Sequence, residues 1–299
     1  MQNSDRISEG ITMRPQASAL KALLDQPNLQ IMPGCGDAMG ARLIEEASFR
    51  IGFISGSSIS AMRLAMPDMD LLSFPEMANT VETITTAAPN GLWLADGDTG
   101  HGNALAVQKT IRAYARRGTA AVLIEDKAWP RPLGYDGAKL VIERDAAILR
   151  CRAAVEACRE EGILLLARTD ARTSRGFDEA LMRLKAFVAE GADILFLDSP
   201  QSEAEMHAVV AACNGKPPLA VTSPAGKHFM PENAELQRLG FKIVVYPQEI
   251  LAATVYAVRA ALAGLRGGVK PPMASPVELA TAIRSADYLA QDARWPDPR

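Results

Sequence analysis

Eight short apolar segments, each ending in polar residues or glycine and each followed by a helical pattern, constrain the fold of this chain most. They occupy residues 29–33, 51–55, 92–96, 121–125, 163–168, 194–198, 219–222 and 243–246. Most are continuous apolar runs, which are typical of parallel strands covered on both faces. Eight strand–helix units predict a (β/α)8 barrel of the TIM type. A doubly wound open sheet remains the alternative, but polar residues at nearly every strand end favour the barrel, which carries its active site there.

Two of the helical patterns have clear ends. Residues 103–117 and 177–190 are each followed by a glycine, Gly118 and Gly191, that suits a left-handed C-terminal cap. Ser202 with Glu205 three residues later predicts a capping box at the start of another helix.

The length of the chain suits one large domain with short additions. The 299 residues, 48% of them hydrophobic, exceed the ~250 residues that such a barrel commonly takes. We expect an N-terminal arm over residues 1–18, a catalytic barrel over residues 19–266 and a C-terminal helical tail over residues 267–299. Gly267-Gly268 and then Pro271-Pro272 predict a break before a last helical stretch over residues 276–289. That tail either packs on its own barrel or reaches a partner subunit.

The composition excludes some partners. The 32 basic and 35 acidic residues are balanced, so neither nucleic acid nor an anionic membrane is indicated as a partner. No apolar run is long enough to span a bilayer, and the N-terminus lacks the pattern of a signal peptide. The four cysteines form no CxxC pair, so we expect reduced, structural thiols in a cytoplasmic protein.

Four carboxylates follow the third and fourth predicted strands. Asp96 and Asp98 end the third, and Glu125 and Asp126 end the fourth. Such acids at neighbouring strand ends would repel one another unless a divalent cation neutralised them. Ligands that are all oxygen suit Mg²⁺, or Mn²⁺, better than Zn²⁺. The alternative for the aspartates alone is a glycine-rich turn whose carboxylates cap a helix, and it is weakened by the acids of the next strand.

An anion-binding segment follows the second predicted strand. Ser55, Gly56 and Ser57 stand at a helix start, where successive backbone N–H groups favour an anion. An ordinary serine-capped helix is the alternative for this segment. Asp68, farther along, is by itself equally well explained as a solvated loop acid.

Polar residues also end the fifth, sixth and seventh predicted strands. Arg168 there is either the partner of the carboxylates or a clamp for a substrate carboxylate. Asp198 and Thr222 end the next two strands in the same way. His101 is expected to line the mouth of the barrel, whereas His207 and His228 are expected on the surface.

Several of these motifs together resemble one known family. Residues 96–102 resemble the D-x-D-x-G-[YFH]-G signature of the isocitrate lyase / phosphoenolpyruvate mutase superfamily. Residues 124–127, 167–171 and 66–68 match other landmarks of that family in order and spacing. The resemblance covers roughly residues 20 to 265, and its motifs are spread over six strand–helix units.

The resemblance implies a role for each site residue. It implies that Asp98 holds Mg²⁺ directly or through water, that Asp96 and Glu125 hold the waters of the metal, and that Asp126 supports them. It also implies a (β/α)8 fold and a homotetramer in which the last helices are swapped between neighbouring subunits. It implies substrate binding by the backbone of Ser55, Gly56 and Ser57 and by Arg168, with Asp68 near the reacting group. We therefore expect catalytic roles for Asp68, Arg168 and Glu125, and from their places at strand ends we expect Asp198 and Thr222 to bind substrate as well.

One loop departs from the lyases of this family. They carry K-[KR]-C-G-H after the fourth strand with the cysteine as proton donor, whereas residues 131–135 here read Arg-Pro-Leu-Gly-Tyr. Leu133 cannot transfer a proton. The loop also lacks the Asn or Thr of the mutases and phosphonopyruvate hydrolases. Residues 103–105 and the loop resemble the oxaloacetate decarboxylase branch, but Tyr246-Pro247 resembles the lyases.

We therefore expect an Mg²⁺-dependent lyase that cleaves a C–C bond of a 2-oxo or 2-hydroxy dicarboxylate through an enolate, as in oxaloacetate decarboxylation. One alternative is C–P chemistry of the phosphonopyruvate hydrolase or phosphoenolpyruvate mutase type. Another is a methylisocitrate lyase-type enzyme with an altered proton donor. A catalytically inactive binding or scaffold protein is the alternative from a different class.

Overall fold

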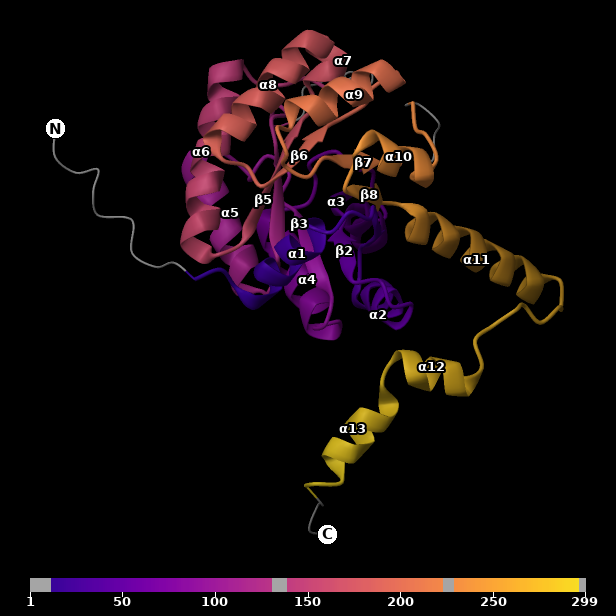
Figure 1. The fold of residues 1–299 in the computed structure, drawn as a ribbon. Helices are drawn as coiled ribbons and strands as arrows, with labels where there is room; N and C mark the ends of the chain where they lie inside the picture. Colours follow the sequence, from indigo (N-terminus) through magenta and orange to yellow (C-terminus); the bar gives the residue numbers. More distant parts are fainter. Residues whose placement is uncertain (1–11, 131–138, 223–228, 296–299) are drawn as a thin grey trace.

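The computed structural model describes residues 12–130, 139–222 and 229–295, and eight parallel strands form its centre (Figure 1). The strands are β1 Gln30–Cys35, β2 Ile51–Ile54, β3 Leu92–Asp96, β4 Ala121–Glu125, β5 Leu164–Thr169, β6 Ile194–Leu197, β7 Leu219–Val221 and β8 Ile243–Tyr246. Their order is β6-β5-β4-β3-β2-β1-β8-β7. A parallel bridge between Leu195 and Pro218 joins β6 to the segment that enters β7. The sheet thus forms a nearly closed barrel, so the predicted (β/α)8 fold is confirmed and the open sheet is excluded.

Helices surround the strands. They are α1 Pro15–Leu24, α2 Ala38–Glu46, α3 Gly56–Ile59, η1 Ser60–Leu64, α4 Phe74–Ala87, α5 Ala104–Arg116, α6 Arg144–Glu161, α7 Ala171–Arg175, α8 Phe177–Glu190, α9 Glu203–Ala212, α10 Asn233–Leu239, α11 Glu249–Arg266, α12 Pro276–Ala282 and α13 Ser285–Asp292. None of the described helices is long and apolar enough to cross a membrane.

The two predicted helix ends are confirmed, and the predicted capping box is half right. Gly118 and Gly191 have φ of 89° and 102°, conformations that L side chains avoid. Ser202 caps α9 by accepting from the Glu205 N–H at 3.2 Å. The Glu205 carboxylate, however, accepts from the backbone of Gln201 at 2.8 Å instead of Ser202, because it also binds the guanidinium of Arg172.

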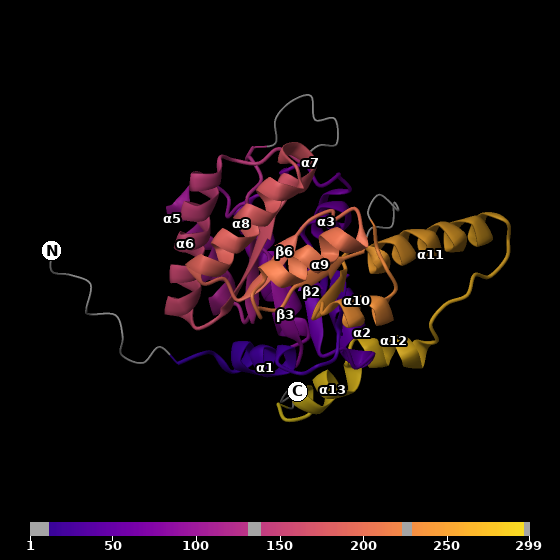
Figure 2. The same cartoon turned by 45° about the horizontal axis from the view of Figure 1, so that its top comes forward.

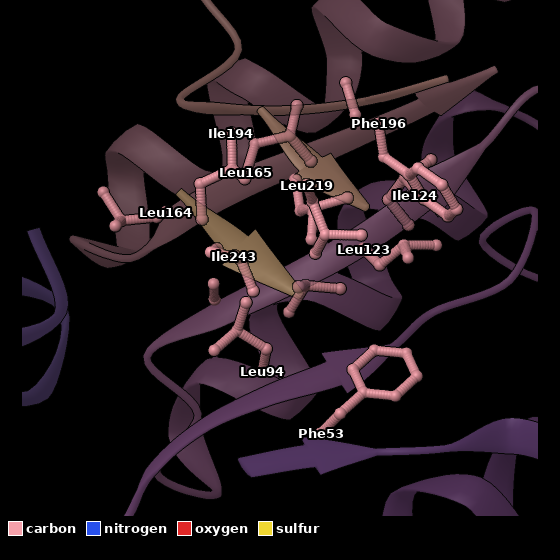
Figure 3. Packing of buried hydrophobic residues seen from close by; sticks show 14 of the residues in the cluster. Phe53, Leu94, Leu123, Ile124, Leu164, Leu165, Ile194, Phe196, Leu219 and Ile243 are labelled. Atoms are coloured by element: carbon pink, nitrogen blue, oxygen red, sulfur yellow. The ribbon is translucent and has the colours of Figure 1, made fainter. Parts of the chain in front are cut away.

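The core lies inside the barrel and between the strands and the helices. Leu94 on β3, Leu165 on β5 and Ile194 on β6 are completely buried, and Figure 3 shows them among the packed apolar side chains of the core. Branched aliphatic residues fill this space because the chain has only 5% aromatic residues. Trp93 is the largest fully buried side chain among the described residues, and its Nε1 donates to the Ala88 carbonyl at 2.8 Å.

The C-terminal tail differs from the barrel. Helix α11 extends away from the strands, and the chain then returns with α12 toward α2 (Figure 2). The predicted last helix is two helices, because Arg284 adopts a left-handed φ of 53° between α12 and α13. None of these three helices has a buried residue. Helix α1 begins at Pro15, and the domain boundaries at residues 18 and 266 remain predictions.

Candidate active site

A cavity of about 200 Å³ opens at the carboxyl ends of the strands. Its floor is apolar and comes from the barrel interior, including Phe53, Leu123 and Phe196. Seven of the residues predicted to form the site line it: Ser55, Ser57, Asp68, Asp96, Arg168, Asp198 and Thr222. A second, much smaller cavity adjoins it, is lined by Gly56, Asp68, Asp98 and His101, and shares the Asp68 wall. The fold therefore gathers predicted residues from five strand–helix units, those of β2, β3, β5, β6 and β7, at one end of the barrel.

The turn after β3 holds two carboxylates side by side. Asp96 Oδ1 accepts from the Asp98 N–H at 3.1 Å, and Asp96 Oδ2 accepts from the Gly56 N–H at 3.3 Å. A Cβ on Gly56 would lie 3.0 Å from Asp96 Oδ2 and 3.7 Å from Asp98 Oδ1, so this glycine lets the backbone approach both acids. Asp98 itself has a left-handed φ of 48°, which aims its side chain out of the strand direction.

These two acids are crowded and poorly neutralised. Loss of hydration, followed by the charge of Glu125, raises the pKa of Asp96 to about 6. Loss of hydration, followed by the charges of Asp96 and Glu125, raises the pKa of Asp98 well above its ordinary range. Protonation of this acid pair, or binding of a cation to it, is therefore favourable.

Arg168, at the end of β5, lies in a cage of carboxylates. Its Nε and Nη2 donate to the two oxygens of Asp170 at 2.8 and 2.7 Å. Glu125 Oε2 lies 3.4 Å from Nε, and Asp198 Oδ1 lies 3.5 Å from Nη2. The guanidinium also stands over the Phe196 ring at 4.9 Å from its centroid, which fixes its plane. Arg168 is thus a partner of the carboxylates, and it also lines the cavity, whereas its role as a clamp for a substrate carboxylate remains a prediction.

Two lysines complete this cluster, and sequence reasoning missed them. Lys139 Nζ lies 2.7 Å from Asp198 Oδ2 and 3.0 Å from Asp170 Oδ1. Lys127 Nζ lies 2.7 Å from Glu125 Oε1, an ion pair without hydrogen-bond geometry. Lys127 stands inside a recognised motif, but no local signal marks Lys139. An antiparallel bridge between Lys127 and Val141 brings the segment that contains Lys139 back to the strand ends.

Cations determine the pKa shifts in the cluster around Arg168. Burial alone would raise the pKa of Asp170, but the charges of Arg168 and Lys139 lower it far below its ordinary range. Burial alone would lower the pKa of Lys127, but the charge of Glu125 raises it. The lowered pKa of Asp170 favours its ionised form, which anchors Arg168.

The side chain of Asp126 binds the turn after β5, and its support of the metal remains a prediction. Its Oδ1 accepts from the Asp170 N–H at 2.9 Å, and its Oδ2 accepts from Thr169 Oγ1 at 2.7 Å and from Arg183 Nη1 at 3.1 Å. It lines neither cavity. The reason is the alternation of side chains along a strand, which turns Asp126 away from the side that Glu125 faces. Burial and the nearby charge of Asp170 raise the pKa of Asp126 to about 6.

The helix start after β2 is serine-capped, and anion binding by its backbone remains a prediction. Ser55 Oγ caps α3 by accepting from the Ser58 N–H at 3.4 Å and lies 3.0 Å from Ser57 Oγ. Both serines also line the large cavity. Across the cavity, Thr222 Oγ1 lies 2.6 Å from Glu249 Oε1.

The remaining predictions divide between described and undescribed residues. His101 lines the small cavity and meets the Phe74 ring edge-on at 5.7 Å. His207 is exposed on α9, as predicted. Leu133 and the rest of the loop over residues 131–135, whose sequence differs from that of the lyases, lie outside the described residues, as does His228.

Direct coordination of a metal by several side chains is not preformed. Among residues 12–130, 139–222 and 229–295, no three acid, histidine or cysteine side chains converge closely enough to ligate one ion. A hydrated cation held through its waters needs fewer direct contacts, and Mg²⁺ commonly keeps several waters in proteins. The crowded oxygen donors of Asp96 and Asp98 fit such an ion.

Comparisons with known proteins agree with this geometry. The family model described as "Phosphoenolpyruvate phosphomutase" matches residues 20–266. The chain is 34% identical to 2,3-dimethylmalate lyase of Eubacterium barkeri over 85% of this chain and 86% of that protein. It is 38% identical to the oxaloacetate decarboxylase of Paraburkholderia xenovorans over 65% of this chain and 64% of that protein.

Solved structures give the same result. Oxaloacetate acetylhydrolase in complex with the inhibitor 3,3-difluorooxalacetate has a TM-score of 0.89 and 30% identity over 95% of this chain and 98% of that one. Phosphonopyruvate hydrolase in complex with oxalate and Mg²⁺ has a TM-score of 0.82 and 27% identity over 94% of this chain and 99% of that one. The chain is an enzyme of the phosphoenolpyruvate mutase / isocitrate lyase superfamily, many of whose named members are lyases.

Proposed function

We propose that this enzyme is an Mg²⁺-dependent carbon–carbon lyase that acts on a small 2-oxo or 2-hydroxy dicarboxylate, with oxaloacetate as the first substrate to test. The observation that carries the proposal is that a crowded acid, Asp96, and a caged arginine, Arg168, line one cavity, while Asp98 lines the small cavity that adjoins it. Its volume of about 200 Å³ suits a substrate of this size. The oxaloacetate-directed relatives support the same choice.

The metal would be held by the acids of β3 and β4. Asp98 would contact it directly or through water, and Asp96 and Glu125 would hold its waters; Mn²⁺ would satisfy the same oxygen donors. When bound, Mg²⁺ would stabilise the negative charge that develops on the substrate as the bond breaks. The bound metal in the phosphonopyruvate hydrolase structure supports this assignment.

The protein side chains would bind, orient and enclose the substrate. Arg168 would bind a substrate carboxylate with the donors that its cage leaves available, and the backbone of Ser55 to Ser57 would bind the carboxylate from the other side. Asp68, on the wall shared by both cavities, would stand beside the reacting group. Asp198 and Thr222 would close the far wall. The apolar floor would exclude water, which strengthens each of these contacts.

The assembly and location are part of the proposal. Helices α11, α12 and α13 expose large apolar side chains, including Tyr256 at 77%, Val277 at 75% and Leu289 at 69%. Neighbouring subunits of a homotetramer that exchange these helices would cover them. All four cysteines are buried and unbonded, which supports a reducing, cytoplasmic location.

A product screen tests the proposed reaction. Purified enzyme with Mg²⁺ is expected to release pyruvate from oxaloacetate faster than Mg²⁺ alone does. Phosphate from phosphonopyruvate would instead indicate C–P chemistry, and cleavage of methylisocitrate or 2,3-dimethylmalate would indicate an aldol-type lyase. The Asp98→Asn variant should lose the activity, whereas Asp25→Asn, which removes an exposed acid of the same type, should keep it. Absence of turnover with every substrate would contradict the proposal.

A further inference from the structure

Arg183 on α8 is buried to 1% exposure and lines neither cavity. Its Nη1 donates to Asp126 Oδ2 at 3.1 Å, and its Nε donates to Glu179 Oε1 at 2.8 Å. A buried arginine is costly, and it persists only when its charge and its donors are matched. The match here is specific, because both partners are carboxylates held by further groups.

The inner partner connects Arg183 to the cavity. Asp126 accepts from the backbone N–H of Asp170 and from the hydroxyl of Thr169, so it fixes the turn after β5. The carboxylate of Asp170 then binds Arg168 through two hydrogen bonds. A continuous series of contacts therefore joins α8 to the guanidinium that lines the cavity.

The outer partner connects Arg183 to α6. Arg144 Nε donates to Glu179 Oε1 at 3.1 Å, and its Nη2 contacts the other oxygen of the same carboxylate. We call the series Arg144, Glu179, Arg183, Asp126, Asp170 and Arg168 the charge chain. Its charges alternate in sign except between Asp126 and Asp170, two acids that are joined through the backbone N–H of Asp170.

We propose that Arg183 is a positioning residue for Arg168, and that Asp126 transmits this restraint through Asp170 instead of supporting the metal. Without Arg183, Asp126 would lose its ion-pair partner beside the Asp170 carboxylate. The repulsion between the two carboxylates would displace Asp170 and disturb the two hydrogen bonds that orient Arg168. The role of Arg168 in substrate binding rests on the proposed function, but its coupling to Arg183 does not.

A double-mutant cycle tests the coupling without any ligand. Unfolding in urea is measured for wild type, Arg183→Met, Arg168→Met and the double variant. The effects on the unfolding equilibrium constant should deviate from multiplicativity by more than about two-fold, as expected for groups in one network. Arg152→Met is the control, because Arg152 binds Glu190 between the same two helices at 2.8 Å but has no contact with the charge chain. Its effect should combine multiplicatively with that of Arg168→Met.

Calorimetry separates the positioning role from a metal role. In Arg183→Met, oxalate binding at saturating Mg²⁺ should weaken by about ten-fold or more, as is typical when a residue that orients a ligand-binding group is lost. Binding of Mg²⁺ alone should stay within about two-fold of wild type. Arg183→Lys, which keeps the charge, should recover part of the oxalate affinity. If Arg183→Met does not fold, Glu179→Gln and Asp126→Asn should show the same pattern with smaller losses.

The outcomes are distinct. Multiplicative stabilities, with oxalate affinity unchanged, would make Arg183 a purely structural residue and overturn the inference. Equal losses of Mg²⁺ and oxalate affinity would return Asp126 to the metal site and also overturn it. A wild type that fails to bind oxalate would contradict the proposed function, whereas the stability cycle would still decide the inference.

Discussion

Asp96 and Asp170 each stand at the carboxyl end of a barrel strand, and their pKa values shift in opposite directions. Loss of hydration and the charge of Glu125 raise the pKa of Asp96 to about 6. Asp170 is completely buried, but the cations Arg168 and Lys139 outweigh burial and lower its pKa. The two aspartates therefore differ because their neighbours carry charges of opposite sign. The β5 acid anchors an arginine, and the β3 acids are left for a cation.

The largest effect is expected from the variant that removes Arg168, the cation that pairs with Asp170. Arg168→Met would leave Asp170, Glu125 and Asp198 without their shared partner, and breaking such a buried pair costs about 3–5 kcal/mol. Activity should fall by about 10³-fold or more, since the substrate clamp is lost as well. Urea unfolding and turnover of oxaloacetate measure the two effects. A stable, active variant would show that Arg168 neither anchors the acids nor binds substrate.

Removing Asp98, one of the two crowded acids after β3, should abolish activity without loss of stability. Asp98→Ala is expected to abolish Mg²⁺-dependent turnover, because it removes a proposed ligand of the metal. The metal-free variant should be as stable as wild type or more stable, because like-charge repulsion at the turn is relieved. Thermal unfolding without Mg²⁺ checks this. A clear loss of stability would mean that Asp98 is a structural acid like Asp170.

The pH dependence of stability should differ between the two groups. A raised pKa means that the folded protein binds more protons, so ionisation of Asp96 should reduce the stability of the metal-free protein as the pH rises from about 4 to about 6. The lowered pKa of Asp170 acts oppositely, since its contribution is present above pH ~4 and is lost at lower pH. Asp96→Asn should therefore gain roughly 1–3 kcal/mol on wild type between pH 4 and pH 7. An identical pH profile for the two proteins would contradict this.

A smaller effect is expected from Lys139→Met. Asp170 and Asp198 would each lose one cation, but both would keep Arg168. We expect a loss of about 1–2 kcal/mol in unfolding free energy and about a ten-fold rise in KM for oxaloacetate. Lys139→Arg, which preserves the charge, should restore most of both. A Lys139→Met loss as large as that of Arg168→Met would mean that the lysine is the main anchor of this group.

Patterns that depend on local burial could be predicted from sequence. The strands were predicted within one or two residues because continuous apolar runs are needed wherever both faces of a strand are covered. The acidic turn after β3 and Arg168 were found because polar groups at strand ends interrupt such runs. The left-handed Arg284 that splits the last helix was not signalled, since neither glycine nor asparagine marks it.

The missed features depend on tertiary contacts or on a rule that was not applied. The contact of Lys139 with Asp198 joins residues from separate strand–helix units, so no short motif records it. Arg183 reads as one more basic residue on a helix until its burial is known. Asp126 could have been separated from Glu125 by the alternation of side chains in a strand.

The central claim is that the acids of β3 receive a cation, whereas Asp126 and Asp170 serve the protein framework. Calorimetric titration with Mg²⁺ at pH 6, in two buffers of different ionisation enthalpy, tests it most directly. Wild type and Asp126→Asn should bind Mg²⁺ with similar affinity and release protons, because the pKa values of Asp96 and Asp98 are raised without the metal and a bound cation would lower them. Asp98→Asn should not bind. Retained Mg²⁺ binding in Asp98→Asn together with its loss in Asp126→Asn would contradict the account.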